Sequence, residues 1–438
     1  MKGVIQKSRN GRSACCTNAC ARLVLTKQGK LLDGQETGIL FTELCVKQAS
    51  KSGRIGIVLP NGYLGNRSER YHTFREWLLR HCKLVAVCSF PRFTFKTSGA
   101  DVSASVVYLQ KRAKPLKDAK ATDDYNFSVQ MIENVGWNLG DKKAAPRFVR
   151  NEDDGSFVID ESGNRILDAD FASALEDLRR SAAGSEFPWL RKAIPLSKSQ
   201  TAGWGVSIKQ VTSDVDLTID PKRYCRKVSE LRKTISAKPN VPLGDVVDVL
   251  PEKKTAKGTT IRIDGKKLYR YVELQDIGYG DFDYVDLRGW QLPQRAKHFA
   301  ELGDIYVGAI WGSVAKWCFI GPAEEDIVVT NGCHRLRMKA GKEGLLEDVV
   351  AFLCTEAYAV QMRSFARGSD GLAEVTPDDL NKVLVPFLGS AERKELRTFV
   401  DSMKAGAPDL KGKVNGLLKD GEISTPAVPH RPSHVVLV

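Results

Sequence analysis

The chain has 438 residues, of which 42% are hydrophobic and 27% are charged, a balance typical of globular domains. Disordered, collagen-like and fibrous classes are therefore excluded, and the length predicts two or three domains of roughly 100 to 200 residues each. The formal net charge of +13 favours a polyanionic partner, either nucleic acid or an anionic membrane surface.

No run of residues approaches the roughly 20 consecutive apolar residues that a membrane span requires, so no membrane partner is expected. Ten cysteines in a chain of this length do not form a dense disulfide framework, and the first residues lack the apolar core of a secretory signal. Both features indicate a reducing, cytoplasmic location. Cys15, Cys16 and Cys20 lack a second ligand pair at the spacing of zinc sites, so no metal site is predicted.

The first 111 residues alternate between helical periodicity and short apolar runs. One such run ends in Pro60, Asn61 and Gly62, which is typical of a buried strand closed by a turn. The predicted elements are a helix over 38–53, a strand over 55–59, a helix from Ser68, and strands within 83–90 and 102–111. Alternating helices and buried strands predict an α/β sheet.

The remaining residues are more mixed. Two turn-rich stretches around Asp153 and Gly163 predict hairpin loops, and a short helix is expected from Asp170. Strands with glycine-rich turns are expected beyond Lys238. Further predictions are one amphipathic helix over 344–366, another helix over 391–406, and the four regions 1–113, 114–237 (connecting), 238–390 and 391–438 (C-terminal helix and tail).

The order of motifs in residues 40–111 is "LFTE…GRIGIVLPNGYLGN…FREWLL…LVAVCSFPRFTF…VSASVVYLQK". It resembles the second half of the catalytic domain in adenine-N6 DNA methyltransferases, especially the methylation subunits of type I restriction-modification systems. The resemblance implies the C-terminal half of a Rossmann-like, S-adenosylmethionine-dependent fold. In that family the target adenine is flipped from the duplex and stacked on an aromatic ring. By resemblance this ring is Phe95, or Phe93 if the loop register differs by two.

The same resemblance places Pro60, Asn61 and Gly62 beside the active site, where the family's sheet turns. Arg92 and Lys96 are candidates for phosphate contacts. An alternative remains for each of these groups: both phenylalanines could be core residues, and both cations could be solvated surface charge.

Two family motifs are missing. The family binds S-adenosylmethionine with a glycine-rich strand-to-helix turn and holds the adenine amino group with an "NPPF" or "DPPY" loop. The chain contains no Pro-Pro dipeptide, and the "GWG" at Gly203 and "GYG" at Gly278 lie outside a strand-to-helix setting. S-adenosylmethionine is thus implied as cofactor while its main binding motif is absent. We expect the chain to begin after the catalytic loop, so that a separate chain supplies the N-terminal half; a truncated product is the alternative.

Residues 238–390 carry five blocks that resemble the target-recognition domain of type I specificity subunits. The blocks are "VPLGDVVDVL", "YRYVELQDIG", "ELGDIYVGAIWGSVAKWCFI", "IVVTNGCHRLRM" and "YAVQMRSFARGSDGLAEVTPDDLNKVLVPF". The resemblance implies an α+β domain that binds double-stranded DNA through loops carrying basic, amide and aromatic side chains. The candidate DNA-binding residues are Lys253, Lys254, Lys257, Trp311, Ser313, Lys316, Arg335, Arg363 and Arg367. For each one singly, solvated surface charge is the alternative.

These resemblances imply a subunit of a bacterial or archaeal DNA adenine-N6 methyltransferase, of the restriction-modification or phage-defence type. It would recognise the DNA target and stack the flipped adenine, and a restriction subunit would be a further partner. One alternative is a non-catalytic, specificity-type DNA-binding subunit that docks onto a methyltransferase. A second is a decayed gene product with neither activity.

Overall fold

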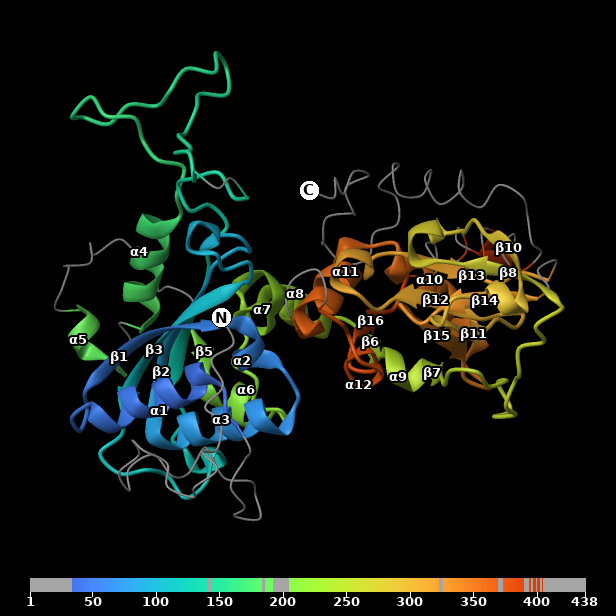
Figure 1. Ribbon diagram of the computed structural model, residues 1–438, viewed down its shortest axis with the longest axis horizontal. Helices are drawn as coiled ribbons and strands as arrows, with labels where there is room; N and C mark the ends of the chain where they lie inside the picture. The colour runs from blue at the N-terminus through green and yellow to red at the C-terminus, as the bar shows by residue number, and fades with distance from the viewer. Residues whose placement is uncertain are drawn as a thin grey trace. The chain divides into compact units, whose positions relative to one another are not determined.

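The computed structural model describes residues 34–140, 143–182, 186–191, 205–322, 326–368 and 373–389, and six single positions between 394 and 404. Two compact units divide the chain (Figure 1). The first comprises Met1–Arg226 and Arg367–Asp370, and the second comprises Lys227–Ala366 and Gly371–Val438. The three N-terminal cysteines and most of the helix predicted over 391–406 lie outside the described residues.

The first unit is built on a five-stranded sheet. Its strands are β1 (Arg54–Pro60), β2 (Cys82–Ser89), β3 (Ala104–Lys111), β4 (Asn126–Met131) and β5 (Val206–Ser207), in the order β1-β3-β2-β4-β5. Strand β3 is antiparallel to both β1 and β2, and β4 is parallel to β2. The carboxyl ends of β1, β2 and β4 therefore meet at one edge of the sheet, called here the carboxyl edge; the other is the amino edge.

Helices cover this sheet. They are α1 (Thr37–Gln48), α2 (Asn61–Gly65), α3 (Glu69–His81), α4 (Phe171–Ala182), α5 (Pro188–Arg191), α6 (Ile208–Thr212) and α7 (Pro221–Tyr224), with 3-10 turns η1 (Lys96–Ser98) and η2 (Ala119–Ala121). The apolar side chains of α3 that have helical spacing, Phe74, Trp77 and Leu78, are buried in the core. The helix from Ser68, the strands predicted up to residue 111 and the helix from Asp170 are confirmed. The first helix ends at Gln48, five residues before the predicted Gly53, and the predicted turn at Asn61 and Gly62 is the short helix α2.

The first unit extends beyond the catalytic-type region expected over 1–113. Strands β4 and β5 come from the expected connecting region, yet they complete the first sheet through Ala86↔Ser128 and Phe127↔Val206. These strands were not predicted because β4 has only six residues and follows the charged stretch 111–120, so the region as a whole has a charged, mixed pattern. The part of the chain expected to connect two domains therefore contributes to the core of the first.

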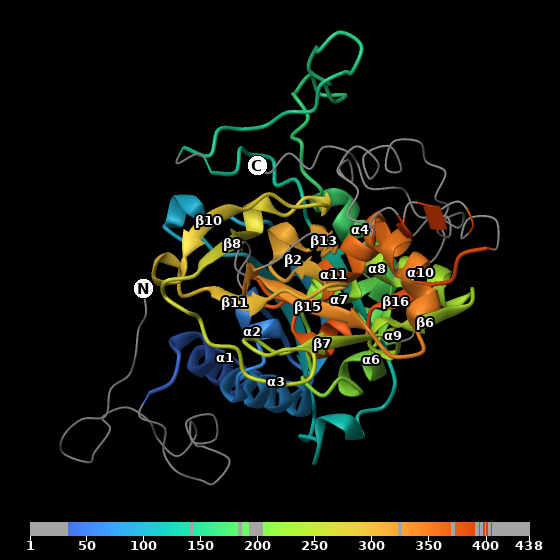
Figure 2. The same ribbon diagram turned by 90° about the vertical axis from the view of Figure 1, so that its right-hand side faces the viewer.

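An arm of residues 132–170 leaves the carboxyl edge after β4 and returns to the sheet at α4, and it projects away from the sheet in Figures 1 and 2. Three of its segments hydrogen-bond in a ring. The amide of Val149 donates to Ile166 O (2.9 Å), that of Ile166 to Val158 O (3.0 Å) and that of Val158 to Val149 O (3.1 Å). Tight turns over 151–156 and 160–164 confirm the two predicted hairpin loops.

The second unit contains two sheets, ordered β10-β8-β14-β11 and β7-β15-β12-β13-β9, and the pair β16-β6. The strands are β6 (Asn240–Pro242), β7 (Val247–Leu250), β8 (Leu268–Val272), β9 (Tyr279–Gly280), β10 (Val285–Arg288), β11 (Ala296–Phe299), β12 (Ile305–Gly308), β13 (Trp317–Phe319), β14 (Ile327–Thr330), β15 (Cys333–Met338) and β16 (Leu384–Pro386). A buried cluster that includes Val272, Tyr306 and Val329 joins residues of both sheets.

Helices of the second unit are α8 (Arg226–Ser236), α9 (Leu243–Val246), α10 (Leu346–Leu353), α11 (Glu356–Phe365) and α12 (Pro377–Leu380), with η3 (Leu274–Asp276), η4 (Gly289–Gln291), η5 (Trp311–Ser313) and η6 (Glu343–Leu345). The single helix predicted over 344–366 is wrong. Thr355 has extended backbone angles, and its side chain accepts from the Tyr358 amide at 3.2 Å, which caps a new helix. No helix within the described part of the chain is long and apolar enough to cross a membrane.

Candidate functional site

Asn61 joins the strand ends at the carboxyl edge of the first unit. It follows β1, begins α2 and is 2% exposed. Ser105 Oγ donates to Asn61 Oδ1 at 2.6 Å, and Asn61 Nδ2 donates to Ser89 Oγ at 3.4 Å. The Asn61 amide donates to Ser103 O at 3.0 Å. Because these partners lie on or beside β2 and β3, the predicted turn fixes three chain segments relative to one another.

The loop of residues 90–103 joins β2 to β3 at the same edge and contains both candidate stacking rings. Phe93 has φ +70°, which is uncommon for a bulky residue. The guanidinium of Arg92 lies over the Phe93 ring at 4.7 Å from its centroid, and Lys96 Nζ lies at 4.8 Å. Arg92 also pairs with Asp101 at 3.1 Å. The Phe93 ring therefore serves as a platform for cations.

Phe95 has different surroundings. Its half-buried ring contacts Phe90 edge to face, with centroids 5.9 Å apart, and Phe90 in turn contacts Phe171 of α4 at 6.1 Å. The amides of Ser98 and Ala100 both donate to Phe95 O, at 3.0 and 3.2 Å. The partner of Phe95 is thus another aromatic ring, whereas the Phe93 ring has two cations over it.

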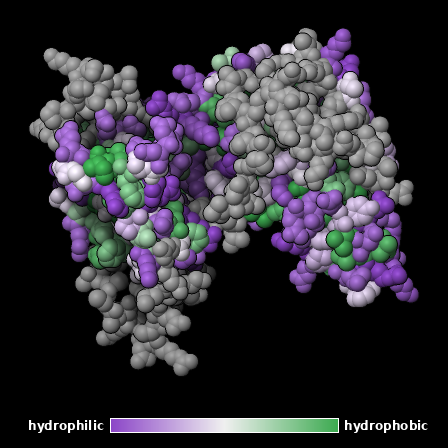
Figure 3. All heavy atoms as spheres, turned by 90° about the horizontal axis from the view of Figure 1, so that it is seen from above, coloured by the Kyte–Doolittle hydropathy of each residue, from purple (hydrophilic) through white to green (hydrophobic). Residues whose placement is uncertain are grey.

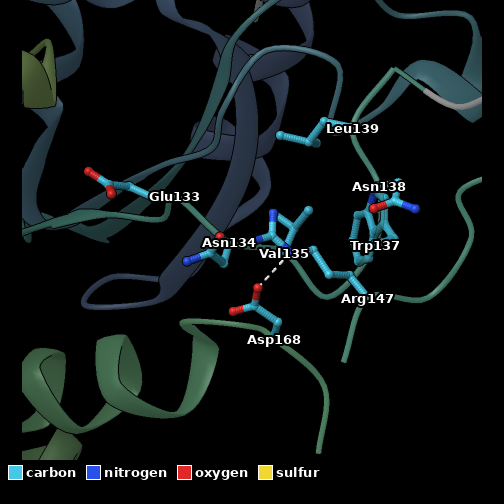
Figure 4. Close-up of a pocket in the computed structure, with 8 residues that line it drawn as sticks. All are labelled: Glu133, Asn134, Val135, Trp137, Asn138, Leu139, Arg147 and Asp168. Atoms are coloured by element: carbon cyan, nitrogen blue, oxygen red, sulfur yellow. Dashed lines mark ion pairs between the residues drawn. The ribbon is translucent and has the colours of Figure 1, made fainter. Parts of the chain in front are cut away.

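A groove of about 350 Å³ lies at the root of the arm, beside the same edge (Figure 4). Figure 4 shows Arg147 directed toward Asp168, with Trp137 and Asn138 on one side and Glu133 on the other. The Arg147 Nε–Asp168 Oδ2 distance is 2.7 Å. The lining mixes donors, acceptors and one indole, so the groove can hold a small polar group, and the sequence did not indicate it.

The residues at this edge do not fit the methyl donor implied by the resemblance. Strand β1 passes directly into the five-residue helix α2, and the glycine near this junction, Gly62, is the second residue of that helix. A Cβ built at Gly62 meets nothing within 4 Å, so the junction makes no close cradle. Among the described residues, no group of His, Cys, Asp or Glu side chains could hold a metal ion.

Arg335, predicted to bind DNA, has a structural role instead. Its side chain is fully buried in β15, where its Nε donates to Asp304 at 2.7 Å and its Nη1 donates to Lys254 O at 2.6 Å. Burial raises the pKa of Asp304, while Arg335 and Arg337 oppose that shift. Strand alternation turns this arginine inward, and its partner lies 31 residues earlier, so a local pattern could not indicate the pairing.

Most other predicted DNA contacts of the third region are also engaged in the fold. Ser313 is buried, and the backbone amide of Trp311 donates to Ala373 O at 2.8 Å. Lys316 Nζ donates to Gln275 O at 2.9 Å. Arg363 pairs with Glu356 at 3.5 Å, and Arg367, which belongs to the first unit, pairs with Asp216. In contrast, the predicted Lys253, Lys254 and Lys257 have exposed side chains in the loop after β7. These three lysines keep the geometry expected of phosphate contacts.

An exposed face with aromatic and basic residues, and one acid, Asp286, lies on the paired strands β8 and β10, labelled in Figure 2, and was not predicted from the sequence. The guanidinium of Arg270 lies 4.9 Å from the Tyr284 ring centroid, and Trp290 is 72% exposed. Arg288 lies on the same face as Arg270, because the two are paired across the strands with Leu268 and Asp286. Arg270, Tyr284, Arg288 and Trp290 are named the Trp290 face. The sequence pattern that could have indicated this face is "YVDLRGW", in which Tyr284 and Trp290 lie on either side of Arg288.

The coloured surface in Figure 3 is mostly hydrophilic with smaller hydrophobic patches. Exposed aromatic rings beside arginines are suited to stacking on bases and contacting phosphates. The Trp290 face and the three lysines after β7 are therefore the candidate polyanion-binding residues of the second unit.

Comparison with known proteins agrees with the resemblance found in the sequence. Residues 25–135 match the family model described as N-6 DNA Methylase. No curated protein matches. The family match covers the first part of the chain and agrees with the resemblance of residues 40–111 to adenine-N6 DNA methyltransferases.

Similar solved structures include the HsdS subunit from Thermoanaerobacter tengcongensis, with 17% identity and a TM-score of 0.29 over 42% of this chain and 46% of that one. The type IIG restriction endonuclease BpuSI has 10% identity and a TM-score of 0.36 over 90% of this chain and 49% of that one. The M protein of the type I restriction enzyme EcoKI has 19% identity and a TM-score of 0.21 over 26% of this chain and 22% of that one. The chain spans less than half the length of each.

Proposed function

Because residues 25–135 match the N-6 DNA methylase family, we propose that the chain is part of a site-specific DNA adenine-N6 methyltransferase of a restriction-modification system. In this proposal the first unit is the adenine-stacking half of the catalytic domain, and the second unit recognises the DNA target. The observation that carries it is the carboxyl edge of the first sheet. There the family match coincides with a rigid turn and an aromatic loop.

Phe95 would stack on the flipped adenine. Extruding a base from the duplex loses its stacking, and an aromatic face replaces that interaction. Phe90 packs against the Phe95 ring in a T-shaped contact, and Asn61 holds the ends of β1, β2 and β3 in place. Arg92 and Lys96 contact the Phe93 ring, so we assign them to shaping the loop, with phosphate contact as a secondary role.

The methyl donor would be S-adenosylmethionine, which supplies an electrophilic methyl group. The described residues do not fit the donor, and the sequence has no loop of the "NPPF" type to hold the adenine amino group. Both functions are therefore assigned to residues outside this sequence, on a partner chain that carries the N-terminal half. A restriction subunit would be a further partner of such an assembly.

DNA recognition would rest on the second unit. Lys253, Lys254 and Lys257 provide exposed positive charge for the phosphate backbone, and the Trp290 face provides arginines and rings for base contacts. A non-catalytic specificity-type subunit is the second candidate function. The observation that favours it is the same lack of fit to the methyl donor.

Methyl transfer from labelled S-adenosylmethionine to mixed-sequence duplex DNA tests the proposal. The chain is assayed alone, then with the product of the adjacent gene that carries an "NPPF"-type motif. Activity in the mixture alone supports the split methyltransferase. Salt-sensitive DNA binding without activity in either sample supports the specificity-type function. Absence of both DNA binding and activity contradicts both.

A further inference from the structure

A second cationic surface lies at the amino edge of the first sheet. A pocket of about 280 Å³ is lined by Lys83, Lys111, Arg112 and Lys114, and no carboxylate lines it. Lys83 belongs to the start of β2 and Lys111 ends β3, so this pocket is at the end of the sheet opposite to Asn61 and Phe95. Strand β2 has eight residues, and at about 3.3 Å per residue the two ends are roughly 25 Å apart.

Two of these cations are held in place by backbone carbonyls. Lys111 Nζ donates to Ala49 O at 2.8 Å and to Lys47 O at 3.2 Å, at the end of α1. Arg112 Nε donates to Leu79 O at 3.3 Å, and its Nη2 donates to the Thr122 hydroxyl at 2.9 Å. None of these contacts neutralises the charge, because the acceptors are uncharged. Lys111 and Arg112 therefore keep their full positive charge beside the pocket that they help to line.

The pocket continues into an exposed basic segment. Residues 111–120 contain five lysines and arginines and one acid, Asp118, whose carboxylate accepts from the Lys120 amide at 2.8 Å. The side chains of Lys114 and Lys117 are exposed, and Lys83 Nζ lies 5.0 Å from the Tyr125 ring centroid. The cations thus extend from the pocket as a row, which suits a polymer of phosphates better than a single anion.

We propose that Lys83, Lys111, Arg112, Lys114 and Lys117, named the lysine edge, bind the phosphodiester backbone of duplex DNA at a second place on the first unit, remote from the base-stacking loop. This inference rests on the proposed function only in that DNA is the partner. Two contacts about 25 Å apart on one rigid sheet would hold the DNA against rotation while a base is extruded. Direct base readout is not required of the lysine edge, because phosphate contacts fix position and not sequence.

The test uses the full chain and a mixed-sequence duplex of 25 base pairs in fluorescence anisotropy titrations from 50 to 300 mM salt. The variant Lys83→Gln/Lys114→Gln/Lys117→Gln removes three charges and leaves Lys111 and Arg112 in their carbonyl contacts. The control Lys143→Gln/Lys233→Gln/Lys238→Gln removes three exposed charges elsewhere. Since Lys83 contacts Tyr125, the double variant Lys114→Gln/Lys117→Gln guards against a folding effect, and circular dichroism checks each protein.

The expected result is a loss of at least about tenfold in affinity near 100 mM salt for the triple variant. The slope of log K against log salt concentration should be less negative by about 2 to 3 for the triple variant, since each phosphate contact contributes about 0.9 to that slope. The control should change affinity less than threefold. Equal binding by the triple variant and the control overturns the inference, whether or not methyl transfer occurs. A weakened triple variant without any methyl transfer supports the lysine edge while the catalytic proposal fails.

Discussion

Phe93 and Phe95 lie two residues apart in one loop, yet their environments differ. The Phe93 ring contacts the cations of Arg92 and Lys96, whereas the Phe95 ring makes a T-shaped contact with Phe90. We predict that Phe95→Ala lowers methyl transfer by about 10- to 100-fold, because stacking on an aromatic ring contributes about 1–3 kcal/mol per base. DNA binding by the same variant should stay within about threefold of wild type in anisotropy titrations.

Phe93→Ala is the matched comparison. It removes the cation contacts but not the proposed stacking ring, so methyl transfer should stay within about threefold of wild type. Phe95→Trp should restore most of the activity lost in Phe95→Ala, since any aromatic face can stack on a base. The reverse ranking of the two alanine variants would assign the stacking role to Phe93.

Arg335 was predicted from the sequence to bind DNA, but in the structure its cation stabilises the fold. Its fully buried guanidinium pairs with Asp304, which Arg337 also contacts at 2.9 Å, so removing Arg335 leaves a cavity and takes one of two cations from a buried carboxylate. Arg335→Ala should therefore lower the free energy of unfolding by about 3–5 kcal/mol in urea titrations. The partly exposed Arg363–Glu356 pair is the control, and Arg363→Ala should cost less than about 1 kcal/mol. Similar losses for both variants would contradict the buried-pair account.

His298 in β11 links stability to pH. Its side chain is buried, and burial, with the nearby positive charge of Arg335, lowers its pKa to about 4. As pH falls from 6.5 toward 4, the unfolded chain takes up a proton that the folded chain does not, so stability decreases in that window. The loss is at most about 3 kcal/mol for this group.

The check is the pH dependence of thermal unfolding. His298→Phe cannot titrate, so its melting temperature should fall less steeply than that of wild type between pH 6.5 and pH 4. Because the slopes are compared, a constant packing difference between the proteins does not affect the result. Parallel curves for the two proteins would mean that His298 is not responsible for the dependence.

At the scale of elements, the arm of residues 132–170 is a self-contained addition to the first sheet. Its ring of hydrogen bonds joins its own segments, and Arg150 and Arg165 lie over the Phe157 ring at 4.0 and 4.2 Å. The arm's ends already meet where Gly136 N donates to Asp168 O at 2.9 Å. Replacing residues 137–167 by a short Gly-Ser linker should therefore shift the melting temperature by no more than about 3 °C. A shift above about 10 °C would show that the arm supports the sheet.

The local pattern of apolar and polar residues was sufficient to predict some helices and strands but not others. Residues 68–111 were predictable because α3 has its apolar residues on one buried face and the strands are short apolar runs. The helix α1 was predicted from apolar spacing, yet Phe41 and Leu44 are exposed and Thr42 and Glu43 are buried. The break at Thr355 was not, because a side-chain cap inside an amphipathic pattern leaves the periodicity unchanged. The Asn61 contacts with Ser89 and Ser105 were also not predictable, since they depend on strand register across 28 and 44 residues.

At the scale of the whole molecule, the net charge of +13 is unevenly distributed. Residues 132–170 contain nine acidic and five basic residues, whereas residues 111–120 contain five basic residues and one acid. A basic composition therefore indicated a polyanionic partner without indicating which surfaces would bind it. The structure reduces the candidates to the lysine edge, the lysines after β7 and the Trp290 face, while Arg335 stabilises the fold.

The central claim is that the first unit stacks a flipped adenine during N6 methylation. Its most direct test is to incubate mixed-sequence DNA with S-adenosylmethionine, this chain and its partner chain, then measure N6-methyladenine by mass spectrometry of the digested DNA. The account predicts N6-methyladenine with the wild-type chain and at least about tenfold less with Phe95→Ala at equal DNA binding. Equal amounts from the two proteins, or methylation of a base other than adenine, would contradict it.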